Sequence, residues 1–243
     1  MSTESIRLFR TNEHQCGYYV DRRAQNLVLD PAAPDLGQFY GGALAQGFRR
    51  AGSVIYRPNC SNCQACVPYR IPVASFRPNR SQRRALTRNS DLEHALRPAI
   101  ASYSAPSLGE HVDLYRRYLA ARHAGGGMDD PSQEDFERFL LCPWSSTHFL
   151  EVRLEGALIA NAVTDLSRGT ASAVYTYFAP EYRQRSLGTL AVLFQLEHSR
   201  RMQLAHLYLG YWIAGHPKMD YKRQFQPAEQ YLNGVWRKTL APT

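Results

Sequence analysis

Cysteine supplies the most distinctive chemistry in this sequence of 243 residues. Three of the five cysteines fall in the run CSNCQAC and a fourth lies well upstream: Cys16, Cys60, Cys63 and Cys66. Two residues between cysteines let one tight loop point successive thiolates at a common centre, which fits a zinc ion, an iron-sulfur cluster or a redox-sensitive thiol group. Small thiols packed in a turn are an equal alternative. The usual second Cys-x-x-Cys pair is missing, because Tyr19 stands three residues after Cys16 where that pair would have its second cysteine. Disulfides are less favoured.

Arginine dominates the charge of the N-terminal part. Residues 1–100 hold 14 Arg and no Lys against 7 acidic residues, so they carry +7 of the net charge of +8. The densest stretch, FRPNRSQRRALTR, has no acidic residue, and guanidinium groups bind phosphates bidentately. We therefore predict a nucleic-acid contact through Arg80, Arg83 and Arg84, with a solvated arginine face as the alternative. In RQRSLG, Arg183 and Arg185 precede a predicted helix N-terminus, which is a second candidate phosphate site.

The C-terminal part carries tyrosines, lysines and a strand-end glycine that could form a substrate site. The stretch YLGY at 208–211 ends a predicted strand, where Gly210 lets backbone amides approach a substrate, although it is also explained by a bulge. Tyr175 and Tyr177 project from one face of a neighbouring strand. Tyrosines on strands are more often packing residues, and Asp before a turn is ordinary turn chemistry. The catalytic candidates are Asp165, Tyr175, Tyr211 and Lys218, and the substrate-binding candidates are Tyr177, Gly210, Met219, Tyr221 and Lys222.

Two parts of the sequence, which differ in composition and pattern, must position these residues. Residues 1–97 are rich in Pro, Gly, Arg and Tyr with short apolar stretches, such as 26–29 and 67–76, which predicts a small irregular domain with a few strands. In the part that follows, Ser107 and Glu110 have capping-box spacing and predict the start of a helix that ends at the glycines 125–127. A second helix is predicted after Ser132.

Beyond Pro143 the pattern changes to that of strands. Apolar segments at 148–154, 157–166 and 171–178 are separated by short turns, which predicts a three-stranded antiparallel meander. A helix over 186–202 and a strand over 206–210 follow. This order is the connectivity of the acyltransferase (GNAT) fold that binds acetyl coenzyme A, although fold alone does not give chemistry. We predict an α+β protein, with a cysteine-bearing domain at 1–97 and a GNAT-like domain at 98–243.

The overall composition predicts a soluble protein. It is 44% hydrophobic, which is enough for a real core. The N-terminus MSTESIRLFR has no apolar segment of the signal type, and no apolar run approaches the length of a membrane span. We therefore expect a protein of the reducing cytoplasm with no membrane partner.

Five ordered motifs carry a family resemblance: CGYY from Cys16, QGFRRAGSVIYRPNCSNCQACVPYRIPV from Gln46, NRSQRRALTRNSDL from Asn79, YTYFAPEYRQRSLGTLAV from Tyr175 and YLGYWIAGHPKMDYKRQFQP from Tyr208. Together they resemble the bacterial aspartate/glutamate leucyltransferases, which are relatives of the arginyl-tRNA protein transferases. The resemblance covers nearly the whole chain. It implies a protein of the N-degron pathway that moves leucine from leucyl-tRNA to the N-terminal Asp or Glu of a target protein. It also implies a cysteine-bearing domain followed by an acyltransferase-like domain.

The sequence departs from the family pattern at two places. The arginyl relatives have a second cysteine in the first motif where this chain has Tyr19, so their metal or iron-sulfur centre is not implied intact. Leucyltransferases often have Cys-Arg-Lys-Met in the last motif, where this chain has His216 and Pro217 before Lys218 and Met219. The choice of leucine over arginine as the donated residue rests on the three-cysteine pattern alone.

Such a reaction needs no cofactor for its chemistry. An α-amine has a pKa of about 7.7–8.0 and an aminoacyl-tRNA ester is already activated, so positioning supplies most of the acceleration. A cysteine nucleophile is not required. Arginyl transfer to the same acceptors is one alternative function, and an acetyl-CoA-dependent N-acetyltransferase is another. A non-catalytic nucleic-acid module leaves residues 143–236 without a role.

Overall fold

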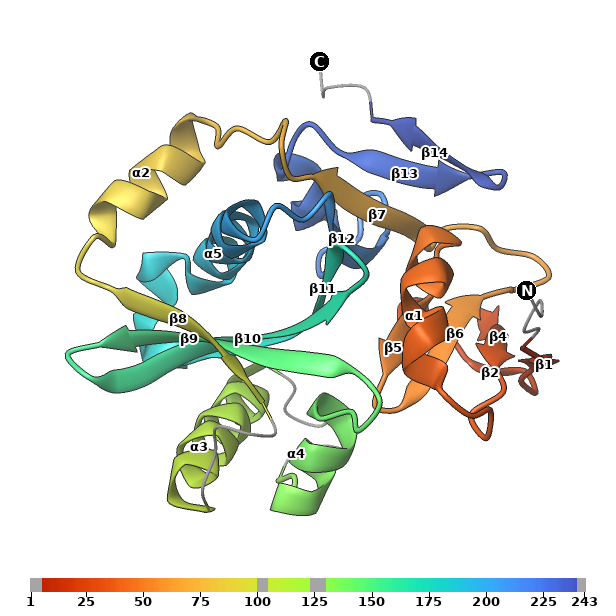
Figure 1. Ribbon diagram of the computed structural model, residues 1–243, viewed down its shortest axis with the longest axis horizontal. Helices are drawn as coiled ribbons and strands as arrows, with labels where there is room; N and C mark the ends of the chain where they lie inside the picture. The colour runs from red at the N-terminus through yellow and green to blue at the C-terminus, as the bar shows by residue number, and fades with distance from the viewer. Residues whose placement is uncertain (1–5, 100–104, 123–129, 240–243) are drawn as a thin grey trace.

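The computed structural model describes residues 6–99, 105–122 and 130–239. Most of the chain is built on one eight-stranded mixed sheet with the order β14-β13-β7-β12-β11-β10-β9-β8 (Figure 1). Its strands are β7 (Val67–Pro72), β8 (Glu93–Pro98), β9 (Ser146–Leu154), β10 (Ala157–Ser167), β11 (Thr170–Phe178), β12 (His206–Trp212), β13 (Glu229–Leu232) and β14 (Val235–Lys238). Neighbouring strands are antiparallel except β11 and β12, which are parallel.

The predicted meander, helix and strand are confirmed. Strands β9, β10 and β11 pair in sequence order, and helix α5 (Leu187–Arg201) leads into β12. The turns between the strands use residues with positive φ, at Glu155 and Gly156 and again at Arg168 and Gly169. Two consecutive positive φ values match the right-handed twist of antiparallel strands, so these short turns set the register of the sheet.

Helices cover both faces of the sheet. In Figure 1, α5 and α2 (Arg80–Arg88) lie on one side of the β8–β11 region, while α3 (Ala105–Arg122) and α4 (Gln133–Leu140) lie on the other. One hydrophobic core joins these layers, with Phe149, Ala162 and Leu190 among its fully buried members. None of the described helices is both long and apolar enough to cross a membrane.

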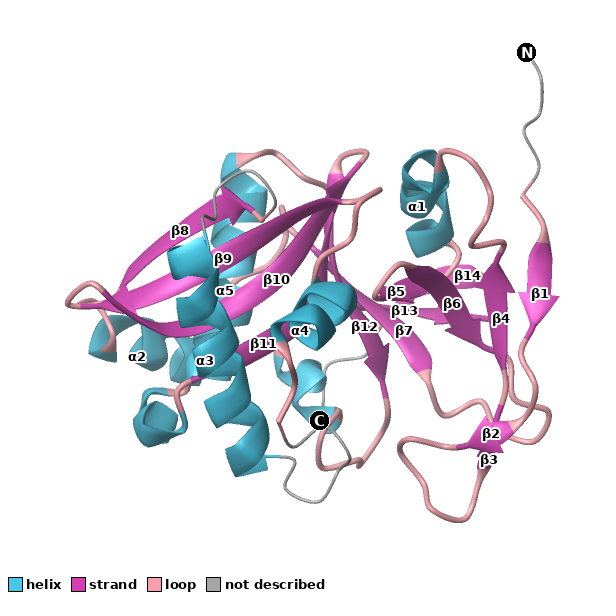
Figure 2. Cartoon of the chain, turned by 90° about the horizontal axis from the view of Figure 1, so that it is seen from below, coloured by secondary structure: helices cyan, strands magenta, loops and turns pink. Residues whose placement is uncertain are grey.

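A smaller sheet lies at the other end of the molecule beside helix α1 (Leu36–Ala45), as Figure 2 shows. Its strand order is β1-β4-β6-β5, from β1 (Leu8–Arg10), β4 (Asn26–Leu29), β5 (Arg49–Ala51) and β6 (Val54–Pro58). A two-stranded sheet, β2 (His14–Gln15) with β3 (Arg23–Ala24), lies next to it. The core of this part includes Tyr40, Leu44 and Ile55 and also Tyr208 of β12, so the two sheets share packing.

The predicted boundary at residue 97 falls inside strand β8 of the large sheet. Strand β7 precedes it in sequence, yet β7 pairs with β12 and β13, and β8 itself pairs with β9. The cysteine run leads directly into β7. Residues on both sides of the boundary therefore build the same sheet.

The predicted start of the first long helix is wrong. Helix α3 begins at Ala105, so Ser107 lies inside its first turn and is not the N-cap. The Glu110 carboxylate accepts the Leu158 N–H at 3.0 Å and pairs with Arg153 at 2.8 Å, which ties α3 to the sheet. The second predicted helix is confirmed as α4, with Ser132 as its N-cap. The glycines 125–127 lie outside the described residues.

Candidate active site where two strands part

The parallel strands β11 and β12 stay together over only a short distance. They pair from Thr170–Ser172 to His206–Tyr208, and beyond this point the register of β12 against β7 also shifts. Gly210 lies at this irregularity with φ of 69°, a left-handed conformation that favours glycine. The bulge expected as one explanation of Gly210 is thus present, while an approach of its backbone amides to a substrate stays a prediction.

Arg49, at the start of β5, occupies the space between the two strands. Its Nη2 donates to the Val174 carbonyl oxygen of β11 at 2.9 Å. A Cβ atom on Gly210 of β12 would lie 3.1 Å from Arg49 Nη1, so glycine is what lets the guanidinium pack against that strand. Sequence reasoning missed Arg49, since nothing in the local pattern shows that β5 stands against β11.

Lys222 places a second cation, which is buried, near the half-buried Arg49. It lies in the short 3-10 helix η2 (Asp220–Gln224) and is only 4% exposed. Its Nζ donates to the Tyr211 carbonyl oxygen and lies 3.9 Å from the Met219 sulfur. Burial and, to a smaller extent, the Arg49 charge lower the pKa of Lys222 to about 7, while Cys66 acts in the opposite direction.

Tyr211 is a structural partner of this site. Its hydroxyl donates to the Tyr56 carbonyl oxygen at 3.0 Å, and its side chain is 1% exposed. Burial raises its pKa well above the ordinary value. Its ring meets that of Tyr56 edge to face at 6.1 Å between centroids. Tyr211 therefore holds β12 against the smaller sheet, and the catalytic role expected for it stays a prediction.

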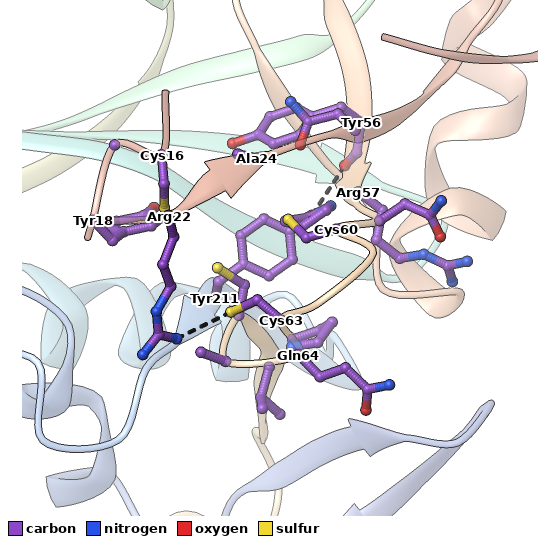
Figure 3. Close-up of a pocket in the computed structure, with 18 of the residues that line it drawn as sticks. Cys16, Tyr18, Arg22, Ala24, Tyr56, Arg57, Cys60, Cys63, Gln64 and Tyr211 are labelled. Atoms are coloured by element: carbon purple, nitrogen blue, oxygen red, sulfur yellow. Dashed lines mark hydrogen bonds between the residues drawn. The ribbon is translucent and has the colours of Figure 1, made fainter. Parts of the chain in front are cut away.

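A cavity of about 830 Å³ opens beside these residues (Figure 3). Segments from three places wall it: the β2–β3 loop, the cysteine run and the turn between β13 and β14. Tyr18, Tyr56 and Tyr211 line the cavity and also lie within electrostatic reach of Arg49. The lining of the cavity therefore includes residues close to Arg49 and to Lys222.

The four predicted cysteines line the same cavity: Cys16, Cys60, Cys63 and Cys66. Hydrogen bonding from the Ala65 N–H and from Arg22, whose Nη1 lies 3.2 Å from the sulfur, lowers the pKa of the Cys63 thiol. Burial raises the pKa of Cys66 to about 12. Within the described ranges no group of three or more His, Cys, Asp or Glu is placed to hold a metal ion. A zinc or iron-sulfur centre here stays a prediction.

Tyr175 and Tyr177 share the face of β11 that meets α3 and α4. Tyr175 packs edge to face on Phe139 at 5.3 Å. The Tyr177 hydroxyl, fully buried, lies 2.9 Å from His111 Nδ1 and 3.0 Å from the Asn161 amide nitrogen. The expected common face is confirmed, and it packs into the core, although neither tyrosine is part of the cavity lining.

The carboxylate of Asp165 is committed to an ion pair in the interior. Arg50 donates to it through Nε at 2.5 Å and Nη2 at 2.8 Å, and both side chains are fully buried. Thr147 and Tyr40 also donate hydroxyl hydrogen bonds to it, at 2.8 Å and 3.0 Å. All these donors belong to the protein itself, so Asp165 connects α1 and β5 to the large sheet.

The remaining candidates lie around η2 and the preceding loop. Lys218 is exposed, Tyr221 is 44% exposed and Met219 is buried against Tyr211. The loop is fixed by Asp220, whose carboxylate accepts the Trp212 indole N–H at 3.1 Å. The structure thus gathers Met219, Lys222 and Gly210 near Arg49, while Lys218 points to solvent.

The two predicted phosphate-binding groups are brought together. Arg185, in the 3-10 helix η1 (Pro180–Arg185), donates to the side chain of Asn89 at 3.1 Å and pairs with Asp91 at 3.0 Å. Asn89 caps the end of α2, so this contact fixes α2 beside the start of α5. Several arginines here are exposed and form no ion pair with a described carboxylate: Arg80, Arg83, Arg84, Arg88 and Arg183.

Comparison with known proteins identifies relatives over almost the whole sequence. Residues 14–84 match the family model "Arginine-tRNA-protein transferase, N terminus" and residues 110–232 match the corresponding C-terminus model. The aspartate/glutamate leucyltransferase of Stenotrophomonas maltophilia K279a is 52% identical, covering 96% of this chain and 93% of that protein. The enzyme of the same name from Xylella fastidiosa 9a5c is 48% identical over 99% of this chain and 95% of that protein.

Similarity to solved structures is weaker. The structure of L-PGS from Bacillus licheniformis aligns with a TM-score of 0.49 and 10% identity, covering 65% of this chain and 49% of that chain. The crystal structure of FemX aligns with a TM-score of 0.48 and 10% identity, covering 86% of this chain and 80% of that chain.

Proposed function

The chain belongs to the arginine-tRNA-protein transferase family, and from this membership we propose that it moves leucine from leucyl-tRNA to the N-terminal Asp or Glu of proteins. The observation that carries this function is identity of about half to aspartate/glutamate leucyltransferases over nearly the full length of both chains. The donor is then an aminoacyl-tRNA and the acceptor a protein α-amine. A cytoplasmic location belongs to the proposal, because aminoacyl-tRNA is made there.

We place the reaction where β11 and β12 part. The acceptor amine attacks the ester carbonyl of leucyl-tRNA, a C–N bond forms and the ester C–O bond breaks. The amine loses a proton, and the terminal ribose hydroxyl of the tRNA leaves with one. Atoms and electrons balance without an oxidant or a metal, so holding the amine against the carbonyl is the main task. Meander, helix and parallel strand in this order support a GNAT-like domain as the frame.

In this proposal some of the predicted site residues lie near the substrate and others have a structural role. Gly210 gives room between the strands, and Met219, Tyr221 and Lys222 stand at the substrate side of β12. We assign Asp165 to structure, because its carboxylate already accepts from Arg50 and two hydroxyl groups. Cysteine attack is not part of the reaction, since the amine reacts directly with the ester.

The transfer is tested with peptides and charged tRNA. Mass spectrometry is expected to show addition of one leucine to peptides that start with Asp or Glu, and no addition to the same peptides starting with Ala or Lys. A mass increase of one arginine with arginyl-tRNA as the only donor would indicate the arginyl alternative. A mass increase of one acetyl group with acetyl coenzyme A as the only donor would indicate the acetyltransferase alternative. No mass change with leucyl-tRNA present removes the proposal.

The arginine face of α2 is expected to bind the tRNA backbone. Replacing Arg83 and Arg84 by Ala should weaken binding of leucyl-tRNA and reduce the slope of log Kd against log salt by roughly 1.5 to 2, because each phosphate contact releases counterions. Filter binding at several salt concentrations measures this slope. A matched control, Arg117 and Arg138 to Ala, removes equal charge from arginines that pair with carboxylates. Equal slopes for both variants would place the tRNA elsewhere.

A further inference from the structure

Arg49 and Lys222 form a pair of cations without a counter-charge. Neither forms an ion pair with any Asp or Glu in the described part of the chain. Their protein partners are neutral: the carbonyl oxygens of Val174 and Tyr211 accept from them. Burying a charged group costs free energy unless the group pairs with an opposite charge. Two such groups within electrostatic reach of each other therefore indicate that an anion from outside completes the site.

We propose that Arg49 and Lys222 bind the side-chain carboxylate of the acceptor's N-terminal Asp or Glu. This rests on the proposed function, which needs an acidic residue to be distinguished from all others. It assigns specificity for the acceptor to residues from opposite ends of the chain, one in β5 and one in η2.

The geometry leaves donors available on both side chains. A guanidinium has five N–H donors, and Arg49 spends one on Val174. An ammonium has three, of which Lys222 donates one to the Tyr211 carbonyl oxygen and one to the Met219 sulfur, so one remains. The free donors match a carboxylate, which accepts a bidentate fork and a further hydrogen bond. Arg49 is half-buried, so part of its side chain is accessible to solvent.

The surroundings favour a carboxylate of an N-terminal residue over a tRNA phosphate. Arg49 lies within electrostatic reach of Tyr18, Tyr56 and Tyr211 and Lys222 is buried, whereas the exposed arginines of α2 face solvent. In Asp or Glu the side-chain carboxylate is only a few bonds from the α-amine. Anchoring it at Arg49 therefore holds the amine beside the gap between β11 and β12, where transfer is placed.

Neutral isosteres supply the discriminating test. Asn and Gln have the shape of Asp and Glu but bring an amide, which leaves both cations without a counter-charge. Peptides starting with Asp, Glu, Asn or Gln are titrated into the protein and binding is measured by calorimetry, which needs no transfer. The wild-type protein is expected to bind the Asp and Glu peptides roughly tenfold or more tightly than the amide peptides.

Arg49→Gln should remove most of this difference while Arg49→Lys restores part of it, since the charge returns without the fork. The control Arg117→Gln removes one charge from the surface and should keep the difference. In transfer assays, Arg49→Gln should raise the KM for the acceptor and leave the KM for leucyl-tRNA unchanged. Circular dichroism and thermal unfolding confirm that each variant is folded.

Equal wild-type affinity for the Asp and Asn peptides overturns the inference, as does an Arg49→Gln variant that keeps the difference. A raised KM for leucyl-tRNA in that variant also overturns it, because Arg49 would then serve the donor. Acidic-peptide binding that depends on Arg49 without any leucine transfer would sustain the carboxylate site while the proposed function fails. The two failures are therefore distinguishable.

Discussion

Replacing Asp165 by Ala is expected to lower the free energy of unfolding by about 3–5 kcal/mol, because it leaves the Arg50 guanidinium buried without its partner. The loss is large since both side chains are fully buried and the carboxylate joins two sheets that share packing. Urea unfolding followed by circular dichroism measures the change.

Two further variants give this experiment its controls. Asp91→Ala removes one partner of the Arg185 pair, and because Asp91 is 48% exposed we expect a much smaller change in the free energy of unfolding than for Asp165→Ala. The double variant Arg50→Met with Asp165→Leu removes both charges and should recover much of the stability. A stable Asp165→Ala protein that has lost leucine transfer would instead support the catalytic role expected from the sequence.

Replacing Lys222 by Met is expected to change how stability depends on pH. Burial lowers the pKa of Lys222 to about 7 from 10.5. Between these values the unfolded chain binds a proton that the folded chain does not, so the free energy of unfolding rises with pH, by about 1.4 kcal/mol per pH unit. Urea unfolding at pH 7, 8 and 9 should show this rise in the wild-type protein and its absence in Lys222→Met.

The matched control is Lys218→Met, because Lys218 is an exposed lysine of the same loop. It should retain the wild-type slope. If Lys222→Met keeps the slope as well, another group is responsible and the ammonium is not desolvated in the folded protein.

The same titration affects binding of an acidic acceptor. The groups that face Lys222 are Arg49, Cys66 and the Tyr211 carbonyl, with the Met219 sulfur nearby. A bound carboxylate favours the charged ammonium, so binding near pH 8 should take up a proton, and affinity should fall as pH rises above about 7. Calorimetry in two buffers of different ionisation enthalpy detects this uptake, which Lys222→Met should abolish.

The sequence was sufficient for elements with strong local patterns. Alternation of apolar residues predicted the meander of β9, β10 and β11, and the helical spacing predicted α5. Ser132 predicted the start of α4 correctly, because its side chain accepts the Asp135 N–H and completes a capping box there. At Ser107 the same pattern failed, since Glu110 is drawn to Arg153 and to the Leu158 N–H and α3 begins before it.

The site was harder to predict because its residues meet only through tertiary structure. Lys222 and Gly210 were among the expected residues, and the family motif that contains them supported the choice. Arg49 and Arg50 stood in a quoted motif, yet neighbouring arginines on a strand point to opposite faces. One faces the strand gap and the other pairs with Asp165. Which of the two arginines faces the strand gap and which pairs with Asp165 is decided only by the pairing of segments that are distant in the sequence.

The position of β7 in the large sheet has a consequence for how the chain matures on the ribosome. β7 is translated early, but both of its neighbours, β12 and β13, come from the last part of the chain. Until those residues emerge, the edges of β7 have no partner. The cavity beside the cysteine run is then also incomplete, because Tyr211 and residues 231–234 form part of its lining. Pairing across such sequence distance is slow. The N-terminal part is therefore completed last, although it is made first.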